Sequence, residues 1–233
     1  QVVKTGDEVN LGNRTLKFVE APMLHWPDSM FTYVKEDEIL MPNDAFGQHL
    51  ASSQLFDGEI EESILMDEAA KYYANILMPF APQIIRKIEE LSGLGIKPRM
   101  IAPSHGVIWR SDPGKIVNAY LEWSKGSAKR KAVIVYDTMW GSTQEMAHAI
   151  SDAIAKQGLE VHVFHIRKSD LVEIMKHILD AKVVLIGAPT INNNMFPTVS
   201  FFLNYAIGLR PKGKLWASFG SYGWGGGALK GIN

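Results

Sequence analysis

The sequence predicts an α/β protein whose second half folds as a doubly wound parallel sheet. From Ala132 onward, short runs rich in Val and Ile alternate with amphipathic stretches of helical period. Strands that alternate with helices in this way favour a parallel sheet joined by right-handed crossovers. Three of the predicted strands also end in loops rich in glycine, hydroxyl or amide residues, and ligands of such sheets lie beyond the carboxyl ends of the strands.

The first half of the chain predicts a mixture of strands and helices. Residues 2–20 have the pattern of a hairpin, with strands at 2–4 and 14–20 around Gly6. A long helical pattern covers residues 64–91, and Pro79 and Pro82 are expected to break it in two, because proline cannot continue a helical hydrogen-bond ladder. The remaining predicted elements are strands at 30–34, 38–41 and 99–102 and a helix at 113–123.

The predicted elements of the second half follow a short linker. Residues 124–131 are rich in Gly, Ser and basic side chains, which is typical of a connection between domains. We therefore expect one domain at 1–123 and a second at 132–233. In the second domain we expect strands at 132–136, 160–166, 183–187 and 215–219, and helices at 144–157, 170–179 and 198–206.

Composition narrows the class of function. The chain has 233 residues, 46% of them hydrophobic, and a net charge of −1, so it has no basic field for nucleic acid or an anionic membrane. No run approaches the roughly 18 apolar residues that a membrane span needs. Because there is no cysteine, disulfides, thiolate metal sites and cysteine nucleophiles are excluded, and a cytoplasmic setting fits. The chain begins at Gln1 within a predicted hairpin and ends in a predicted first helical turn, so we expect a fragment of a longer protein.

The segment from Thr138 to Thr143 predicts a phosphate site. It follows a β-branched strand and leads directly into a helix, so its hydroxyls and backbone N–H groups lie at a helix N-terminus, where the helix dipole favours an anion. Gly141 lets the backbone approach a ligand closely. The segment is neither a Walker loop nor a dinucleotide fingerprint, since no Gly-Lys-Ser/Thr and no G-x-G-x-x-G is present. The alternative is an ordinary helix cap by Ser142 or Thr143.

Two more loops are expected at the same end of the sheet. Residues 188–195 contain three consecutive asparagines, and residues 220–227 are rich in glycine. A phosphate loop together with Trp140, Tyr222 and Trp224 is what a flat heteroaromatic mononucleotide requires, because the rings can stack while backbone groups bond its edge. Taken singly, the asparagine run could be a solvated turn and the glycine loop a flexible connector.

Three short pieces of the first half predict a metal site. They are His-Trp-Pro-Asp-Ser-Met around His25, Asn-Asp-Ala-Phe-Gly around Asp44, and Pro-Ser-His-Gly around His105. Each places an imidazole or carboxylate in a loop after an apolar run, and this ligand set suits Fe, Mn or Zn. The alternatives are a hydrogen-bonded loop histidine and an Asx turn at Asn43-Asp44.

Read in order, these motifs resemble the flavodiiron proteins, also called A-type flavoproteins. The resemblance implies the C-terminal part of a metallo-β-lactamase-like αββα domain followed by a flavodoxin-like doubly wound parallel sheet, both truncated. It implies FMN as the cofactor of the second domain, with the first loop around the phosphate and the other two around the isoalloxazine. The residues implied in FMN binding are Thr138, Met139, Trp140, Gly141, Ser142, Thr143, Pro189, Thr190, Ile191, Asn192, Asn193, Asn194, Ser221, Tyr222, Gly223, Trp224, Gly225 and Gly226.

The same resemblance implies two non-haem iron ions in the first domain. It gives His25 to one iron, His105 to the other and Asp44 as the bridging carboxylate. The family's remaining ligands lie in a His-x-Glu-x-Asp-His motif upstream, which residues 1–233 do not contain. We expect that motif in the missing N-terminal part of the first domain.

The implied activity is an oxidoreductase that passes electrons through FMN to the diiron centre, where dioxygen becomes water or nitric oxide becomes nitrous oxide. The donor would be rubredoxin, a reduced deazaflavin coenzyme or a reductase. A head-to-tail homodimer, or a dimer of dimers, is implied because flavin and iron of one subunit lie far apart. Two alternatives stay open: an FMN electron-carrier module without diiron catalysis, and a zinc hydrolase with a flavodoxin domain.

Overall fold

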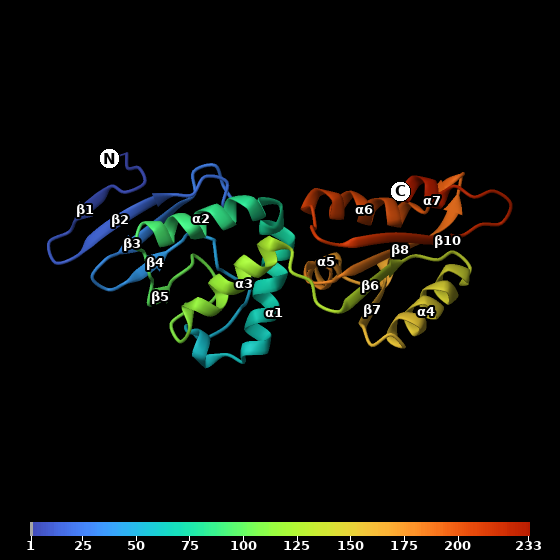
Figure 1. The fold of residues 1–233 in the computed structure, drawn as a ribbon, viewed down its shortest axis with the longest axis horizontal. Helices are drawn as coiled ribbons and strands as arrows, with labels where there is room; N and C mark the ends of the chain where they lie inside the picture. Colours follow the sequence, from blue (N-terminus) through green and yellow to red (C-terminus); the bar gives the residue numbers. More distant parts are fainter. Residues whose placement is uncertain (1) are drawn as a thin grey trace. The chain divides into compact units, whose positions relative to one another are not determined.

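The computed structural model describes residues 2–233, which divide into two compact units between Lys125 and Gly126 (Figure 1). Both units are α/β, as the sequence predicts. None of the helices formed by residues 2–233 has the length and apolarity needed to cross a bilayer.

The first unit contains a sheet in the strand order β1-β2-β3-β4-β5. Neighbouring strands from β1 to β4 run antiparallel, and β5 lies parallel to β4. The first expected strand, at residues 2–4, is wrong. Strand β1 lies further along, because the Asn10 side chain accepts a hydrogen bond from the Gly12 N–H at 2.7 Å and Gly12 adopts a φ of 97°, which together fix the hairpin turn there. The strands are β1 (Glu8–Asn10), β2 (Thr15–Glu20), β3 (Met30–Val34), β4 (Ile39–Met41) and β5 (Met100–Ile101).

The helices of the first unit follow the predicted pattern, with the break at the prolines. Helix α1 (Glu62–Tyr72) continues through a wide π turn (Tyr73–Leu77) and a tight turn (Met78–Phe80) into α2 (Ala81–Gly93). Helix α2 packs against α3 (Pro113–Lys125). Their buried faces carry Ile84, Leu91, Ile116 and Tyr120.

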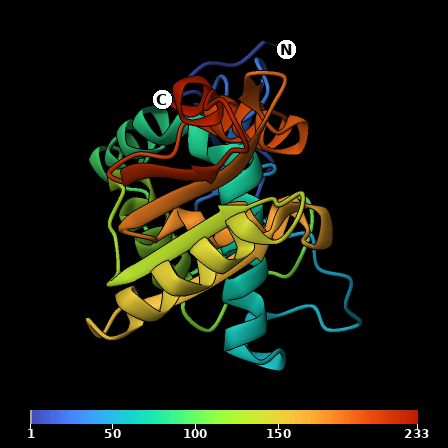
Figure 2. The same ribbon diagram turned by 90° about the vertical axis from the view of Figure 1, so that its right-hand side faces the viewer.

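The second unit has the parallel sheet that the sequence predicts, in the strand order β10-β8-β6-β7. The chain moves from β6 to β7 in one direction and then to β8 on the other side of β6. Helix α4 (Ser142–Ala155) therefore covers one face and α6 (Pro197–Leu209) the other (Figures 1 and 2). The switch in strand order lies between β6 and β8, and a crevice opens at such a point. The elements are β6 (Lys131–Tyr136), β7 (Glu160–His165), α5 (Leu171–Leu179), β8 (Val183–Ile191) and β10 (Leu215–Ser221).

Strand β8 is longer than predicted. The expected end at residue 187 is wrong, because the strand continues to Ile191 and turns back as the short antiparallel strand β9 (Asn194–Met195). Asn192 and Asn193 both adopt positive φ, 50° and 56°, which is the conformation of a two-residue hairpin turn. Pro189, Thr190 and Ile191 consequently lie on a strand at the edge of the crevice. The described chain ends with the short helix α7 (Ala228–Ile232).

Candidate functional site

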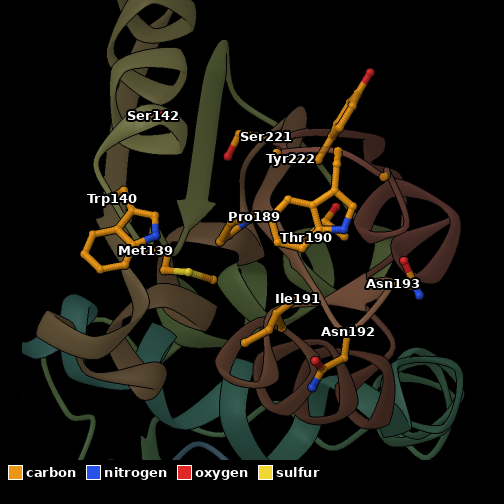
Figure 3. A pocket seen from close by; sticks show the side chains of 13 residues that line it. Met139, Trp140, Ser142, Pro189, Thr190, Ile191, Asn192, Asn193, Ser221 and Tyr222 are labelled. Atoms are coloured by element: carbon orange, nitrogen blue, oxygen red, sulfur yellow. The ribbon is translucent and has the colours of Figure 1, made fainter.

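The three loops predicted to bind a ligand meet at the carboxyl ends of β6, β8 and β10. They enclose an open cavity of about 630 Å³, a size typical of small-molecule sites (Figure 3). Figure 3 shows Met139 and Trp140 on one side of the cavity and Thr190 with Ile191 on the other. The lining residues are Met139, Trp140, Ser142, Pro189, Thr190, Ile191, Asn192, Asn193, Ser221, Tyr222, Gly223, Trp224 and Gly225.

The loop between β6 and α4 has the geometry of an anion site. Gly141 is the residue that precedes the helix, with a φ of 96°, and its N–H donates to Thr138 Oγ1 at 3.0 Å. No side chain caps α4, so the alternative of a cap by Ser142 or Thr143 is wrong. The first N–H groups of a helix have no partner within it, and an anion can accept from them.

The other two loops are tied to each other and to the first. Thr143 is fully buried, and its Oγ1 lies 2.9 Å from Ser221 Oγ. Thr190 Oγ1 accepts from the N–H groups of Gly227 and Ala228, each at 3.2 Å. The glycine loop is therefore anchored at both ends. We conclude that these contacts fix the depth and width of the cavity.

Exposed aromatic rings surround the cavity. Trp140 is 90% exposed, Trp224 99% and Tyr222 68%. A group of exposed apolar side chains, unlike a single one, marks a site of interaction with a ligand or partner. With the uncapped N-terminus of α4 beside them, they suit a ligand that carries both a phosphate and a flat ring.

The sequence reasoning missed a buried charge directly before the phosphate loop. Asp137 is fully buried, and Arg167 Nε donates to both of its carboxylate oxygens at 3.0 Å. Thr198 Oγ1 also donates to Asp137 Oδ2. The available signal was the charged residue at the end of the apolar run 132–136, because such a residue is buried only with a partner.

In the first unit, Asp44 lies between the two predicted imidazole ligands. His25 Nε2 is 3.4 Å from Asp44 Oδ2, and His105 Nε2 is 3.7 Å from Asp44 Oδ1. His105 Nδ1 lies 3.1 Å from the carbonyl oxygen of Gln48 and must donate to it, so in the neutral imidazole the lone pair is on Nε2, the nitrogen that faces Asp44. A lone pair that faces an anion calls for a cation between them, and this arrangement is common around metal ligands.

These residues fit a pair of metal ions but do not complete their coordination. Each ion would receive one imidazole and one oxygen of Asp44, whereas about four ligands are usual. Within residues 2–233, no three acidic or imidazole side chains converge on one point. The ring of Tyr72 lies 5.1 Å from that of His105, and its hydroxyl is buried without a hydrogen-bond partner among the described residues. Burial and the nearby Asp44 raise the pKa of Tyr72.

A network missed by sequence reasoning holds the Asp44 loop in place. Phe46 adopts a φ of 65°, which is unusual for a bulky residue. Its N–H donates to the Tyr120 hydroxyl at 2.9 Å, and its carbonyl accepts from Trp109 Nε1 at 2.8 Å and Gln48 Nε2 at 2.9 Å. These three contacts offset the strain of the turn and fix the position of Asp44.

Two family models match successive parts of the chain. Residues 1–106 match the model of the ODP family of β-lactamases, and residues 134–233 match the flavodoxin model. The chain is thus an α/β protein with a β-lactamase-like part followed by a flavodoxin-like part.

Individual relatives define the family. A nitric oxide reductase of Moorella thermoacetica is 57% identical over 98% of the chain, and a coenzyme F420H(2) oxidase of Methanothermobacter marburgensis is 48% identical over 97%. The chain spans 57% of the length of each. The structure of rubredoxin oxygen:oxidoreductase from Desulfovibrio gigas matches all of the chain with a TM-score of 0.97 and 40% identity, and the chain covers 58% of it. The flavodiiron protein of Giardia intestinalis matches 98% with a TM-score of 0.94 and 39% identity, and the chain covers 56% of it. This chain belongs to the flavodiiron family, as the sequence motifs predicted.

Proposed function

We propose that the second unit binds FMN at the carboxyl ends of β6, β8 and β10. The observation that carries the proposal is the cavity of about 630 Å³ with a helix N-terminus at one side and exposed rings at the other. The segment from Thr138 to Thr143 would hold the phosphate through hydroxyls and backbone N–H groups. Residues 189–194 and 221–226 would contact the isoalloxazine, with Trp140 and Trp224 available for stacking.

In the full-length protein, we propose that the first unit supplies part of a diiron centre. His25 and His105 would each bind one iron through Nε2, and Asp44 would contribute one oxygen to each. The supporting observation is that both imidazole nitrogens face Asp44 while His105 Nδ1 is held by a carbonyl. The remaining ligands would come from outside residues 1–233.

For the full-length protein, these sites support a reductase of dioxygen or nitric oxide. When bound, the flavin supplies electron transfer and the iron pair supplies binding and activation of the gas. Four electrons and four protons convert one dioxygen to two waters. Two electrons and two protons convert two nitric oxide molecules to one nitrous oxide and one water. The chain's own part is to position both cofactors. The cavity at these loops is open to solvent, so a flavin held there would be accessible to a donor.

The donor and the assembly are further parts of this proposal. The relatives are named for nitric oxide, for reduced coenzyme F420 and for rubredoxin, so we expect a rubredoxin, a reduced deazaflavin coenzyme or a reductase as the donor. We expect a head-to-tail homodimer or a dimer of dimers. Sedimentation of the full-length protein tests this, and a monomer at micromolar concentration would contradict it.

Gas reactivity tests the activity. The full-length protein is reduced anaerobically and mixed separately with dioxygen and nitric oxide while flavin absorbance is recorded. Rapid reoxidation by at least one gas, lost after removal of the metal, is the expected result. Reoxidation by neither gas would overturn the proposal. Zinc in place of iron, without oxygen consumption, would instead favour a hydrolase.

A further inference from the structure

The fully buried carboxylate of Asp137 lies at the end of β6, one residue before the loop that we assign to phosphate. Three groups donate to it: the single N–H of Arg167 Nε, shared between both carboxylate oxygens, the Thr198 hydroxyl, and the Thr138 N–H at 2.7 Å. Its charge is therefore held in an environment of few water molecules, where Coulomb interactions are stronger than at the surface.

Arg167 connects this carboxylate to the loop itself. A terminal nitrogen of its guanidinium donates to the carbonyl oxygen of Thr138 at 2.8 Å, and its side chain is 51% exposed. The guanidinium also lies 5.7 Å from the ring of Phe196, next to α6. Arg167 thus holds the first peptide of the loop while it pairs with the buried carboxylate.

The net charge next to the loop affects how well it can bind a phosphate. Residues 138–143 contain no lysine or arginine, so the loop's own donors are neutral. An uncompensated Asp137 would repel a phosphate dianion in that loop, whereas the pair with Arg167 has no net charge. His165 Nε2 lies 3.7 Å from Asp137 Oδ1 and would add positive charge only when protonated.

We propose that the Asp137–Arg167 pair determines the preference of this site for a phosphorylated flavin over the dephosphorylated form. Arg167 acts as a positioning and charge-compensating residue: it orients the Thr138 peptide and cancels the buried carboxylate. The inference rests on the proposed FMN site and deepens it, because it names the residues that make a loop of neutral donors accept a dianion.

Paired titrations of FMN and riboflavin test the proposal. The full-length protein is freed of flavin and titrated at about pH 8, where an ordinary histidine is neutral. Arg167→Gln should weaken FMN binding by about tenfold or more while riboflavin binding changes by less than about twofold. Asp137→Asn should leave FMN binding as tight as in the wild type or tighter. The double variant Asp137→Asn/Arg167→Gln should recover most of the loss.

Controls separate this role from support of the fold. Thr198→Val removes a hydrogen bond to Asp137 but keeps both charges, so it should not change the ratio of FMN to riboflavin affinity. Arg167→Lys also keeps the charge, so it should retain most of the preference for FMN over riboflavin. It is the variant to measure if Arg167→Gln does not fold. Equal weakening of both flavins in Arg167→Gln, or no recovery in the double variant, would overturn the proposal. If the wild type bound neither flavin, the FMN site itself would be refuted instead.

Discussion

Gly47 leaves the space that the His105 ring occupies. A Cβ at this position would lie 2.7 Å from His105 Cε1, 2.9 Å from Nδ1 and 2.9 Å from the His105 carbonyl oxygen. Since one of these contacts is backbone, a side-chain rotation cannot relieve the overlap. We expect Gly47→Ala to lower the free energy of unfolding by about 1–3 kcal/mol and to move His105 away from Asp44. Urea unfolding and the iron content of the full-length protein measure the two effects.

The matched control is Gly93→Ala. Gly93 is the last residue of α2, and a Cβ there meets nothing within 4 Å. Alanine should therefore be neutral or stabilise the protein by about 0.5 kcal/mol. If the Gly47 and Gly93 variants unfolded at the same urea concentration and retained the same iron, the proposed crowding at His105 would be wrong.

The sequence could single out His25, Asp44 and His105, because imidazoles and carboxylates in loops after apolar runs are conspicuous. Their support could not be seen in the same way. Gln48 looks like any amide, and its role depends on Val107 and His105, which lie 59 and 57 positions away in the chain. Such contacts arise from packing between distant segments. A single sequence carries no local signal for them.

At the level of elements, the start of α4 depends on the conformation of Gly141. Its φ of 96° is costly for other residues, although a Cβ would meet nothing within 4 Å. Gly141→Ala should thus cost about 1 kcal/mol of stability through strain alone and should weaken FMN binding by displacing the loop. Gly208→Ala, on an exposed and uncrowded position of α6, is the control and should be neutral or stabilising. Flavin titration and urea unfolding that did not distinguish the two variants would contradict the assigned role of the loop.

The contact between β7 and α5 should make stability depend on pH. His177 of α5 lies with its ring 4.0 Å from that of His162 on β7, and His162 Nε2 pairs with Glu160. Burial, followed by the charges of His162, Lys131 and Lys176, lowers the pKa of His177 to about 4, while Glu173 opposes this.

The sign follows from which state binds the proton. Between pH 6.5 and about 4, the unfolded chain protonates this histidine and the folded chain does not, so stability falls as pH falls through that window. His177→Gln should reduce this slope in urea unfolding measured from pH 7 to pH 4. His148→Gln is the control for replacing a histidine by glutamine, because His148 is an exposed residue of α4 outside the His162–His177 contact. This variant should keep the slope. An unchanged slope in the His177 variant would refute the assignment.

The elements themselves were largely predictable, because apolar periodicity decides them. Besides the strand expected at residues 2–4, the main exception is the continuation of β8 to Ile191. Ala188 and Pro189 resemble the end of a strand, yet Pro189 pairs with Ser221 at the end of β10, and Asn192-Asn193 closes a turn onto a strand of only two residues. Asparagine tolerates left-handed φ, but this pair is a weaker hairpin signal than Asn-Gly. The length of β8 therefore depends on its pairing with β10, a contact between segments that are distant in the sequence.

At the scale of the whole molecule, the metal ligands and the flavin loops lie in different compact units. Each set of residues should therefore be removable without loss of the other cofactor. Asp44→Ala removes the carboxylate that faces both imidazoles, so the full-length protein should lose most of its iron and keep its flavin. Metal analysis and flavin absorbance of the purified variant check this. Loss of flavin from a folded Asp44 variant would contradict independent sites.

The reciprocal change is Thr143→Ala in the second unit. The variant loses a buried hydroxyl that contacts Ser221 Oγ at 2.9 Å and that we assign to the phosphate loop. Loss of one such hydrogen bond should raise the dissociation constant of FMN by about tenfold while iron content stays unchanged. Thr143→Ser keeps the hydroxyl and should remain within about threefold of the wild type. If Thr143→Ala lost both cofactors while its circular dichroism and urea midpoint stayed native, the two sites would have to be coupled, and the assignment of one cofactor to each unit would fail.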